Sequence, residues 1–204
     1  MNCSSSILAL PLREGGQLLA GAADMIRRRG LNTTSVRELA KHARAPLGST
    51  YHYFPGGKTQ LATEAVTFAG DLTAALLARE LENGPVEGLR VFLSMWRKIV
   101  VDTNFRAGCP VLAVSIEDLP EAEAAPREAA AAAFSRWTAL LIASLREHGA
   151  DQADAERTAT LIIAAVEGSV AMCRAERSTR ALDRISDQLE MIVRDTIART
   201  HNGN

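Results

Sequence analysis

The amino-acid sequence predicts an all-α protein of about nine helices, divided into a small N-terminal domain and a larger helical bundle. Two observations lead to this prediction. Apolar residues recur three or four positions apart in segment after segment, as they do along one face of an α-helix. Glycine and proline separate these segments, and no run of alternating apolar and polar residues indicates a β-strand.

The composition is that of a globular protein whose two parts differ in charge. The chain has 204 residues, of which 47% are hydrophobic and 23% are charged. Residues 1–70 contain eight Lys or Arg and four Asp or Glu, a net charge of +4, whereas the remainder carries −5. A basic N-terminal part suits contact with phosphate, although ordinary surface charge would give the same excess.

The cysteines and histidines give no sign of a disulfide framework or a metal site. The chain has three cysteines and four histidines, and none shows metal-ligand spacing. We therefore expect no metal, no cofactor and a reducing, cytoplasmic environment. The first residues do not resemble a signal peptide, and the longest apolar run, 161–166, is too short to span a membrane, so we expect no membrane partner.

The segment 33–61 is predicted to contain two short helices joined by a tight turn, followed by the start of a third. The first short helix has one apolar face, made by Val36, Leu39, Ala40 and Ala43. Ser35, followed three residues later by Glu38, is typical of a capping box, so this helix should begin near Thr34 or Ser35.

The second short helix should occupy residues 46–54. Pro46 suits the first turn of a helix, and Pro55 with the two glycines after it ends the helix near Phe54. A helix of about two turns is not stable alone, so its neighbours must hold one face and leave the other free. This is the pattern of a helix-turn-helix, whose second helix enters the DNA major groove.

DNA recognition requires small residues for close approach, donors that reach phosphates and side chains that reach base edges. Gly48 and Ser49 meet the first requirement. The candidate DNA-binding residues are Thr34, Ser35, Leu47, Gly48, Ser49, Tyr51, His52, Tyr53 and Lys58. For the tyrosines and the histidine, packing alone is the alternative. The Arg27–Arg29 run either stabilises the end of the first helix or contacts phosphate.

Residues 13–68 resemble the DNA-binding motif of the TetR family of transcriptional repressors, and GSTYHYFPGGKTQL resembles its LmrA/YxaF-like branch. Gly108–Val111 and Glu167–Gly168 add a weaker match. The resemblance implies an aromatic residue at the groove (Tyr51), phosphate contact by His52 and Lys58, and Thr50 and Phe54 facing the core.

The sequence departs from the family pattern at three positions. Arg44 stands in the turn where the family usually has glycine, and a left-handed conformation there would cost an arginine about 1 kcal/mol. Leu47 replaces a basic residue of the branch, and Thr50 replaces a more usual leucine. The change at Leu47 makes the operator sequence impossible to infer, but none of the three changes removes the motif.

The remaining chain is predicted to be helical. Residues 1–12 form a flexible tail, and the first helix occupies 13–29. The later helices are expected at 58–82, 86–103, 110–118, 121–148 with a kink or restart at Pro126, from Asp151 or Asp154 to 175, and 181–199. We assign 13–60 to a helix-turn-helix DNA-binding domain and 61–204 to a ligand-binding and dimerisation domain.

The resemblance also implies a two-fold dimer formed through the last two helices, 154–175 and 181–199, because one short recognition helix makes few base contacts. Small residues on the first of these helices, such as Ala155, Ala159, Gly168 and Ser169, would permit close helix approach.

Aromatic residues cluster in the C-terminal domain. Candidates for a small-molecule pocket are Phe92, Trp96, Phe105, Cys109, Leu112, Phe134, Trp137, Glu167 and Met172. The same residues would equally form a packed core. Glu167 is either a partner at a helix interface or the polar anchor of a ligand.

The sequence thus predicts a dimeric repressor that binds a palindromic double-stranded operator and is released by a small apolar or aromatic inducer. Repression and activation are not distinguished by the residues themselves. Two other classes remain as alternatives: a helical protein-interaction module and an all-α enzyme. We expect no enzyme, since the chain contains no nucleophile elbow, phosphate-binding loop or metal-ligand spacing.

Overall fold

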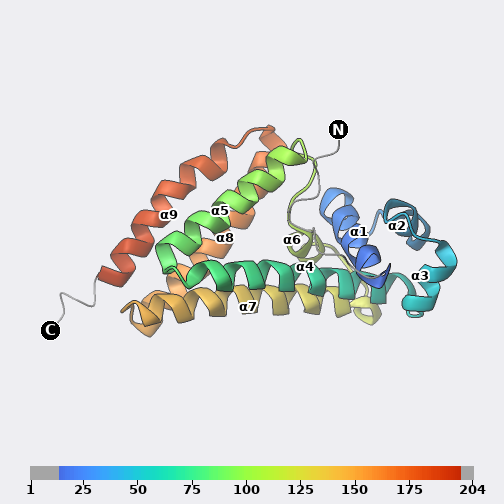
Figure 1. The fold of residues 1–204 in the computed structure, drawn as a ribbon, viewed down its shortest axis with the longest axis horizontal. Helices are drawn as coiled ribbons and strands as arrows, with labels where there is room; N and C mark the ends of the chain where they lie inside the picture. Colours follow the sequence, from blue (N-terminus) through green and yellow to red (C-terminus); the bar gives the residue numbers. More distant parts are fainter. Residues whose placement is uncertain (1–13, 199–204) are drawn as a thin grey trace. The chain divides into compact units, whose positions relative to one another are not determined.

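The computed structural model describes residues 14–198, which form nine α-helices and one 3₁₀ turn and contain no strand (Figure 1). The all-α prediction is confirmed. The helices are α1 (Glu14–Arg29), α2 (Val36–His42), α3 (Leu47–Tyr53), α4 (Gly57–Leu81), α5 (Pro85–Asp102), α6 (Pro110–Ser115), α7 (Ala125–Glu147), α8 (Gln152–Glu176) and α9 (Arg180–Ala198). The predicted tail at 1–12 and the predicted final residue of the last helix, Arg199, lie outside the described residues.

Two compact units make up the chain. Of the described residues, the first unit joins 14–71 with Ala107–Ala133, and the second joins Leu72–Arg106 with 134–198. Helices α4 and α7 therefore each begin in one unit and end in the other. The segment with α6 belongs to the first unit because α6 packs against α1.

The first unit is built around α1, which packs against α2, α3 and α6. The backbones of α1 and α2 approach closely at Gly21, where an added Cβ would lie 2.6 Å from the Cβ of Ala43. The core of this unit includes the fully buried side chains of Leu18, Ile26, Leu39, Leu61 and Val66. The glycine is thus required for the contact that holds the helix-turn-helix on α1.

The turn before α2 and the turn before α3 follow from local chemistry. Ser35 is the N-cap of α2, and its side chain and backbone exchange hydrogen bonds with Glu38, so the predicted capping box is confirmed. Arg44 has a φ of 55° and so adopts the left-handed conformation of the turn. Pro46 is the N-cap of α3 with an extended ψ of 139°, so the helix begins at Leu47 instead of at the proline.

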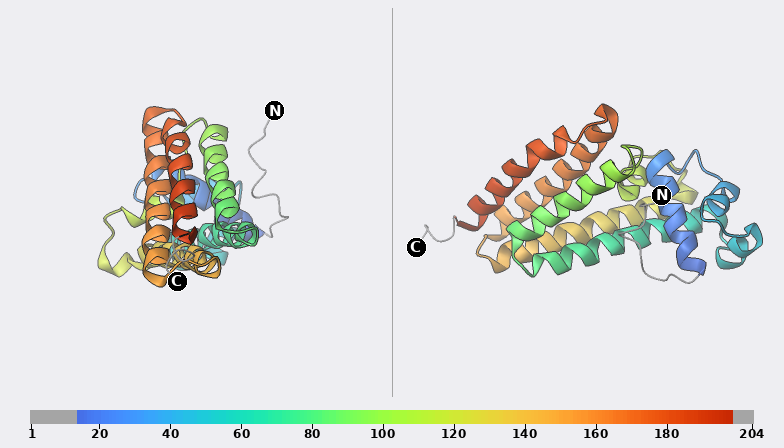
Figure 2. Two further views of the ribbon diagram at one scale, coloured as in Figure 1. Left: turned by 90° about the vertical axis from the view of Figure 1, so that its left-hand side faces the viewer. Right: turned by 45° about the horizontal axis from the view of Figure 1, so that its top comes forward.

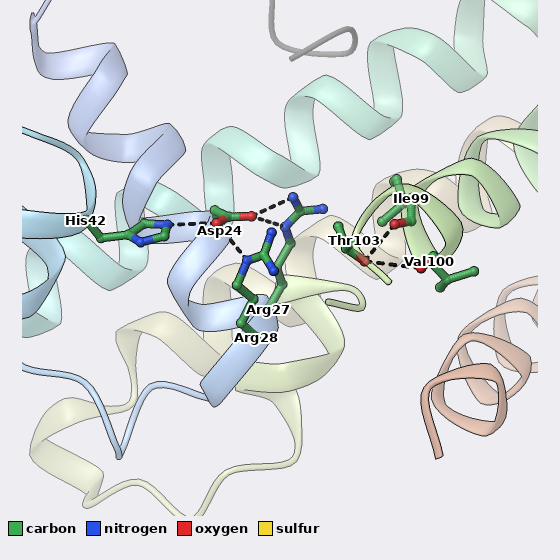
Figure 3. A network of polar contacts seen from close by, with 7 residues as sticks. All are labelled: Asp24, Arg27, Arg28, His42, Ile99, Val100 and Thr103. Atoms are coloured by element: carbon green, nitrogen blue, oxygen red, sulfur yellow. Dashed lines mark hydrogen bonds and ion pairs between the residues drawn. The ribbon is translucent and has the colours of Figure 1, made fainter. Parts of the chain in front are cut away.

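A polar cluster at Asp24 joins the end of α1 to α2 (Figure 3). The Asp24 carboxylate accepts hydrogen bonds from Arg27 (2.8 and 2.6 Å) and Arg28 (2.8 Å), and its Oδ2 lies 2.7 Å from Nε2 of His42. Burial raises the pKa of the Asp24 carboxyl, but the hydrogen bonds and charges of the arginines and the bond with His42 outweigh it, so the pKa falls from 3.8 to about 2.

The second unit is a bundle in which α5, α8 and α9 lie side by side (Figure 2). The apolar face of α5 is buried and consists of Leu89, Phe92, Leu93, Trp96 and Val100. Within the bundle, Thr158 of α8 and Thr196 of α9 share a buried hydrogen bond of 3.0 Å. Arg90 of α5 donates to both carboxylate oxygens of Glu190 of α9, at 2.8 and 2.6 Å.

Two predicted helices have different bounds in the structure, and the cap of a third is decided between its two candidates. The helix predicted at 110–118 ends at Ser115. The helix predicted at 121–148 is divided into a 3₁₀ turn, Glu121–Glu123, and α7, which restarts one residue before Pro126 because proline fits the first turn of a helix. Asp151 is the cap of α8, accepting from the N–H of Asp154 at 3.0 Å.

By length and composition alone, α4 and α8 pass the criteria for a membrane-spanning helix, each with a mean hydropathy of 1.3. Of the apolar 18-residue stretch in each helix, 39% is buried in α4 and 50% in α8. Core helices of globular proteins have the same composition, so this observation is weak support for a membrane protein.

We predict that Asp24→Asn lowers the free energy of unfolding at pH 7 by about 2 kcal/mol, because the shift of its pKa from 3.8 to about 2 measures the stabilisation of the charged carboxylate. Because the pKa of Asp24 is lower in the folded protein, its carboxylate adds to the free energy of unfolding above pH 4. This contribution disappears as the pH falls toward 2 and the carboxylate is protonated. The difference between wild type and variant, measured by urea unfolding, should therefore vanish over that range. Glu82→Gln, which removes an exposed carboxylate, is the control and should show no comparable difference. A difference for Asp24→Asn that does not depend on pH would contradict the assignment.

Candidate nucleic-acid interface

Helix α3 presents one face to the core and the opposite face to solvent. Thr50 is fully buried and Phe54, the C-cap, is 3% exposed, as expected for the core-facing side. Tyr51 is 52% exposed, and His52 is also exposed. The side chains of Tyr51 and His52 thus remain at the surface, because the buried residues on either side of them, Thr50 and Phe54, fix the orientation of the helix.

Tyr53 has a mixed environment. Its side chain is 43% exposed, but its ring lies against α1, where a Cβ added at Gly15 would be 3.7 Å from Cδ1 of Tyr53. The ring also makes an edge contact with His52, with centroids 5.5 Å apart. Tyr53 therefore supports α3 as well as contributing to its exposed side.

The start of α3 is open. Nothing lies within 4 Å of a Cβ added at Gly48, which is exposed, and Leu47 and Ser49 are half-buried. A partner as large as a duplex can therefore come close to the backbone at this helix start. This arrangement agrees with the role expected for Gly48 and Ser49.

The hydroxyl donors expected at the start of α2 form hydrogen bonds within the protein, and their contact with phosphate stays a prediction. Thr34 is 3% exposed and its hydroxyl donates to the carbonyl of Leu31 at 2.7 Å. Ser35 is exposed, but its N–H and hydroxyl both donate to the Glu38 carboxylate, at 3.0 and 2.8 Å. Ser35 thus caps α2, whereas Thr34 belongs to the turn that precedes the cap.

Basic side chains on α2, in the turn after it and at the start of α4 are further candidates for phosphate contact. Arg37, Lys41 and Arg44 are exposed, and Lys58 in the first turn of α4 is half-buried. None of the four makes an ion pair with another described residue. The sequence analysis counted these arginines and lysines in the net charge but did not assign Arg37, Lys41 or Arg44 to the interface. Their exposure, on α2 and in the turn between α2 and α3, was the missing signal.

The nine candidates for a ligand pocket are distributed over both units. Cys109 and Leu112 belong to the first unit, and the other seven belong to the second. In the second unit, Phe92 packs edge-on against Trp96, and Phe134 packs edge-on against Trp137, with centroids 6.2 and 5.5 Å apart.

The candidates also differ in burial. Phe92, Trp96, Cys109, Trp137 and Glu167 are buried, whereas Phe105, Leu112 and Phe134 are half-buried. The indole N–H of Trp96 is buried and has no acceptor among the described residues. Met172 is 52% exposed and is not brought together with the buried aromatic residues.

The exposed side of α8 is unusually apolar. Leu161 is 45% exposed, Ala164 and Gly168 are exposed, and nothing lies within 4 Å of a Cβ added at Gly168. Together with Met172, these residues recur at helical spacing along one stripe. The other small residues of α8 considered in the sequence analysis, Ala155, Ala159 and Ser169, are instead buried within the protomer.

Two family models match the chain. The model of bacterial regulatory proteins of the tetR family matches residues 18–65, and that of the C-terminal domain of LmrA/YxaF-like transcriptional regulators matches residues 85–188. The first contains α2, α3 and the start of α4.

Similar proteins include an uncharacterised HTH-type transcriptional regulator of Mycobacterium tuberculosis, 38% identical over 87% of this chain and 92% of that protein. The HTH-type transcriptional regulator LmrA of Bacillus subtilis is 29% identical over 83% of this chain and 91% of its own length.

Solved structures share the fold. The regulatory protein TetR of Rhodobacter sphaeroides superposes with a TM-score of 0.76 at 22% identity, covering 87% of this chain and 97% of its own. Reduced NemR of Escherichia coli gives a TM-score of 0.72 at 21% identity, covering 88% and 97%. With the exposed α3 and the two matched models, these relatives show that the chain belongs to the TetR family of HTH-type transcriptional regulators, in its LmrA/YxaF-like branch.

Proposed function

We propose that the protein is a cytoplasmic, dimeric repressor that binds a palindromic operator through α3 and is released by a small apolar or aromatic ligand. The observation that carries the proposal is the exposure of Tyr51 and His52 on a helix whose other face is anchored by Thr50 and Phe54. Side chains held outward on a short, supported helix suit entry into a major groove.

The DNA contacts divide into two kinds. Leu47, Gly48, Ser49 and Tyr51 face base edges and thymine methyl groups at the helix start, because small residues there allow close approach. His52, Tyr53, Lys58 and the exposed basic side chains Arg37, Lys41 and Arg44 contact phosphates and fix the register.

Dimerisation through α8 and α9 is supported by the apolar stripe of α8. The centre of α8 is apolar almost all round, but Leu161 and Ala164 remain exposed in the single chain. A second copy of the same helix would cover them, with Gly168 permitting close approach, and would give a symmetric four-helix arrangement with α9. Exposed patches of this kind mark interfaces.

A ligand site in the second unit is supported by its buried aromatic side chains. The unbonded indole N–H of Trp96 offers a hydrogen bond to an acceptor on an otherwise apolar molecule. A ligand that binds one arrangement of the helices more tightly than the other would lower operator affinity by population shift. Met172 belongs to the α8 stripe in this proposal and not to the ligand site.

The proposal is tested with DNA from upstream of the protein's own gene. We predict a footprint on a palindrome and a linear fall of log affinity with log salt concentration. The slope should be about −7, because four basic side chains in each of the two protomers would contact roughly eight phosphates. Gel shifts from 50 to 300 mM salt measure the slope. A protein-interaction module or an enzyme would give no footprint. Transcription in vitro from the same DNA then separates repression from activation.

We predict that Gly48→Glu abolishes operator binding while leaving the fold and the oligomeric state unchanged. Nothing lies within 4 Å of the added Cβ, but the carboxylate would face the DNA.

The double variant Tyr51→Ala, His52→Ala should weaken operator binding about 100-fold, since it removes contacts from the DNA-binding domains of both protomers. Fluorescence anisotropy measures binding, with Val101→Ala as the control for loss of an exposed apolar side chain away from α3. Unchanged affinity in both variants would refute α3 as the recognition helix.

We predict that Gly168→Glu converts the dimer into a folded monomer, because the added side chain is unobstructed within the protomer but would place two like charges across the pairing axis. Sedimentation equilibrium measures the mass and circular dichroism the helix content. Gly48→Glu is the matched control, with the same substitution at another open helical glycine, and should remain dimeric. A dimeric Gly168→Glu protein would assign the interface to another surface.

A further inference from the structure

Glu117, two residues beyond the end of α6, binds the connection between α1 and α2. Its carboxylate accepts hydrogen bonds from the backbone N–H groups of Leu31 and Asn32, the second at 2.6 Å. The side-chain amide of Asn32 donates in return to the carbonyl of Asp118 at 3.3 Å. Residues more than eighty positions apart thus hold one another, and all of them lie in the first unit.

Gly30 makes this contact possible. Its φ is +82°, which ends α1 in the left-handed conformation, and its N–H donates to the carbonyl of Ile26 at 2.8 Å. A Cβ at this position would lie 2.5 Å from Oε1 of Glu117. Glycine is therefore needed twice, for the backbone conformation and for the space that the carboxylate occupies.

The start of α6 holds α1 as well. The N–H of Gly108 donates to the carbonyl of Arg27 at 3.1 Å, satisfying a carbonyl in the last turn of α1. The segment around α6 therefore forms hydrogen bonds with the end of α1 and the turn after it at two points. Gly108 lies before α6 and Glu117 lies after it.

The turn that Glu117 binds determines where α2 begins. Both the N–H and the hydroxyl of Thr34 donate to the carbonyl of Leu31, at 3.0 and 2.7 Å, and Ser35 follows as the N-cap of α2. A carboxylate beyond a helix C-terminus is disfavoured by the helix dipole, so these bonds form against that effect.

We propose that Glu117 is a positioning residue for DNA binding: by fixing the turn from Gly30 to Thr34 it makes the orientation of α2 and α3 on α1 depend on the place of α6. The inference rests on the proposed function for its consequence at the operator, and goes beyond it by naming the contact through which a shift of α6 reaches the recognition helix.

The first test needs no DNA. Amide exchange of Leu31 and Asn32, followed by NMR, should be slow in the wild-type protein and about tenfold or more faster in Glu117→Ala, since each N–H loses a charged acceptor. Asp118→Ala is the matched control, because it removes the neighbouring carboxylate and keeps the carbonyl that Asn32 binds. Equal exchange in the three proteins, or rapid exchange in the wild type, would overturn the contact itself.

The second test measures positioning at the operator. Wild-type protein should prefer one spacing between half-sites over spacings one base pair longer or shorter. Glu117→Ala should bind the preferred operator about tenfold more weakly and should lose much of this preference. A role limited to stability would lower the melting temperature without changing the preferred spacing. Glu117→Gln, which keeps an acceptor oxygen, should be intermediate.

A double-variant cycle connects the two residues. Gly30→Ala should weaken binding in the wild-type background and have a smaller effect in Glu117→Ala, where the carboxylate it would displace is gone. If the effects of Gly30→Ala and Glu117→Ala on operator binding were fully additive, or if Glu117→Ala kept the spacing preference of the wild type, the positioning role would be overturned. Failure of the wild-type protein to bind any operator would instead refute the proposed function, and the exchange measurement would still test the contact.

Discussion

A seven-residue helix has no stability of its own, and the recognition surface therefore depends on how α3 is anchored. The anchors are Thr50 and Phe54, which are buried, and Tyr53, whose ring lies along α1 at Gly15. Because these contacts fix one side of α3 against the protein, the opposite side of the helix stays exposed to solvent. The close approach of Gly21 to Ala43 then holds α2, and with it the turn before α3, on the same helix.

The arginine run at the end of α1 shows how burial and charge decide between alternatives that the sequence leaves open. The sequence analysis considered the helix dipole and phosphate as partners for Arg27 and Arg28. In the structure both bond to Asp24, an acid one turn earlier, and the same carboxylate meets His42 of α2. Local charge here stabilises the contact between helices, while Arg37 and Lys41 of α2 and Arg44 of the following turn remain exposed.

Most of the fold could be predicted from the sequence because its signals are local. The spacing of apolar residues, the capping box at Ser35 and the breaks at glycine and proline identified each helix, with ends that differ by only a few residues. What the sequence did not reveal was tertiary. The bonds of Glu117 with the turn after α1, and the association of α6 with α1, depend on residues brought together by folding.

On α3, the resemblance implied that Thr50 and Phe54 face the core, and both are buried, whereas the DNA contacts of the opposite side stay a prediction. The ligand residues could not be assigned from the sequence, since aromatic side chains pack the same way around a cavity and in a core. Met172 illustrates the limit: its apolar character fits a pocket, a core or an interface equally, and its exposure on α8 separates these.

The apolar stripe on α8 has a consequence for how the cell would set the activity of this protein. If that stripe is where two copies meet, the amount of assembled protein at low abundance grows with the square of chain concentration, so doubling synthesis yields about fourfold more pairs. Occupancy of the target DNA would then respond steeply to expression. A modest fall in the number of chains per cell would release the promoter even without a small molecule.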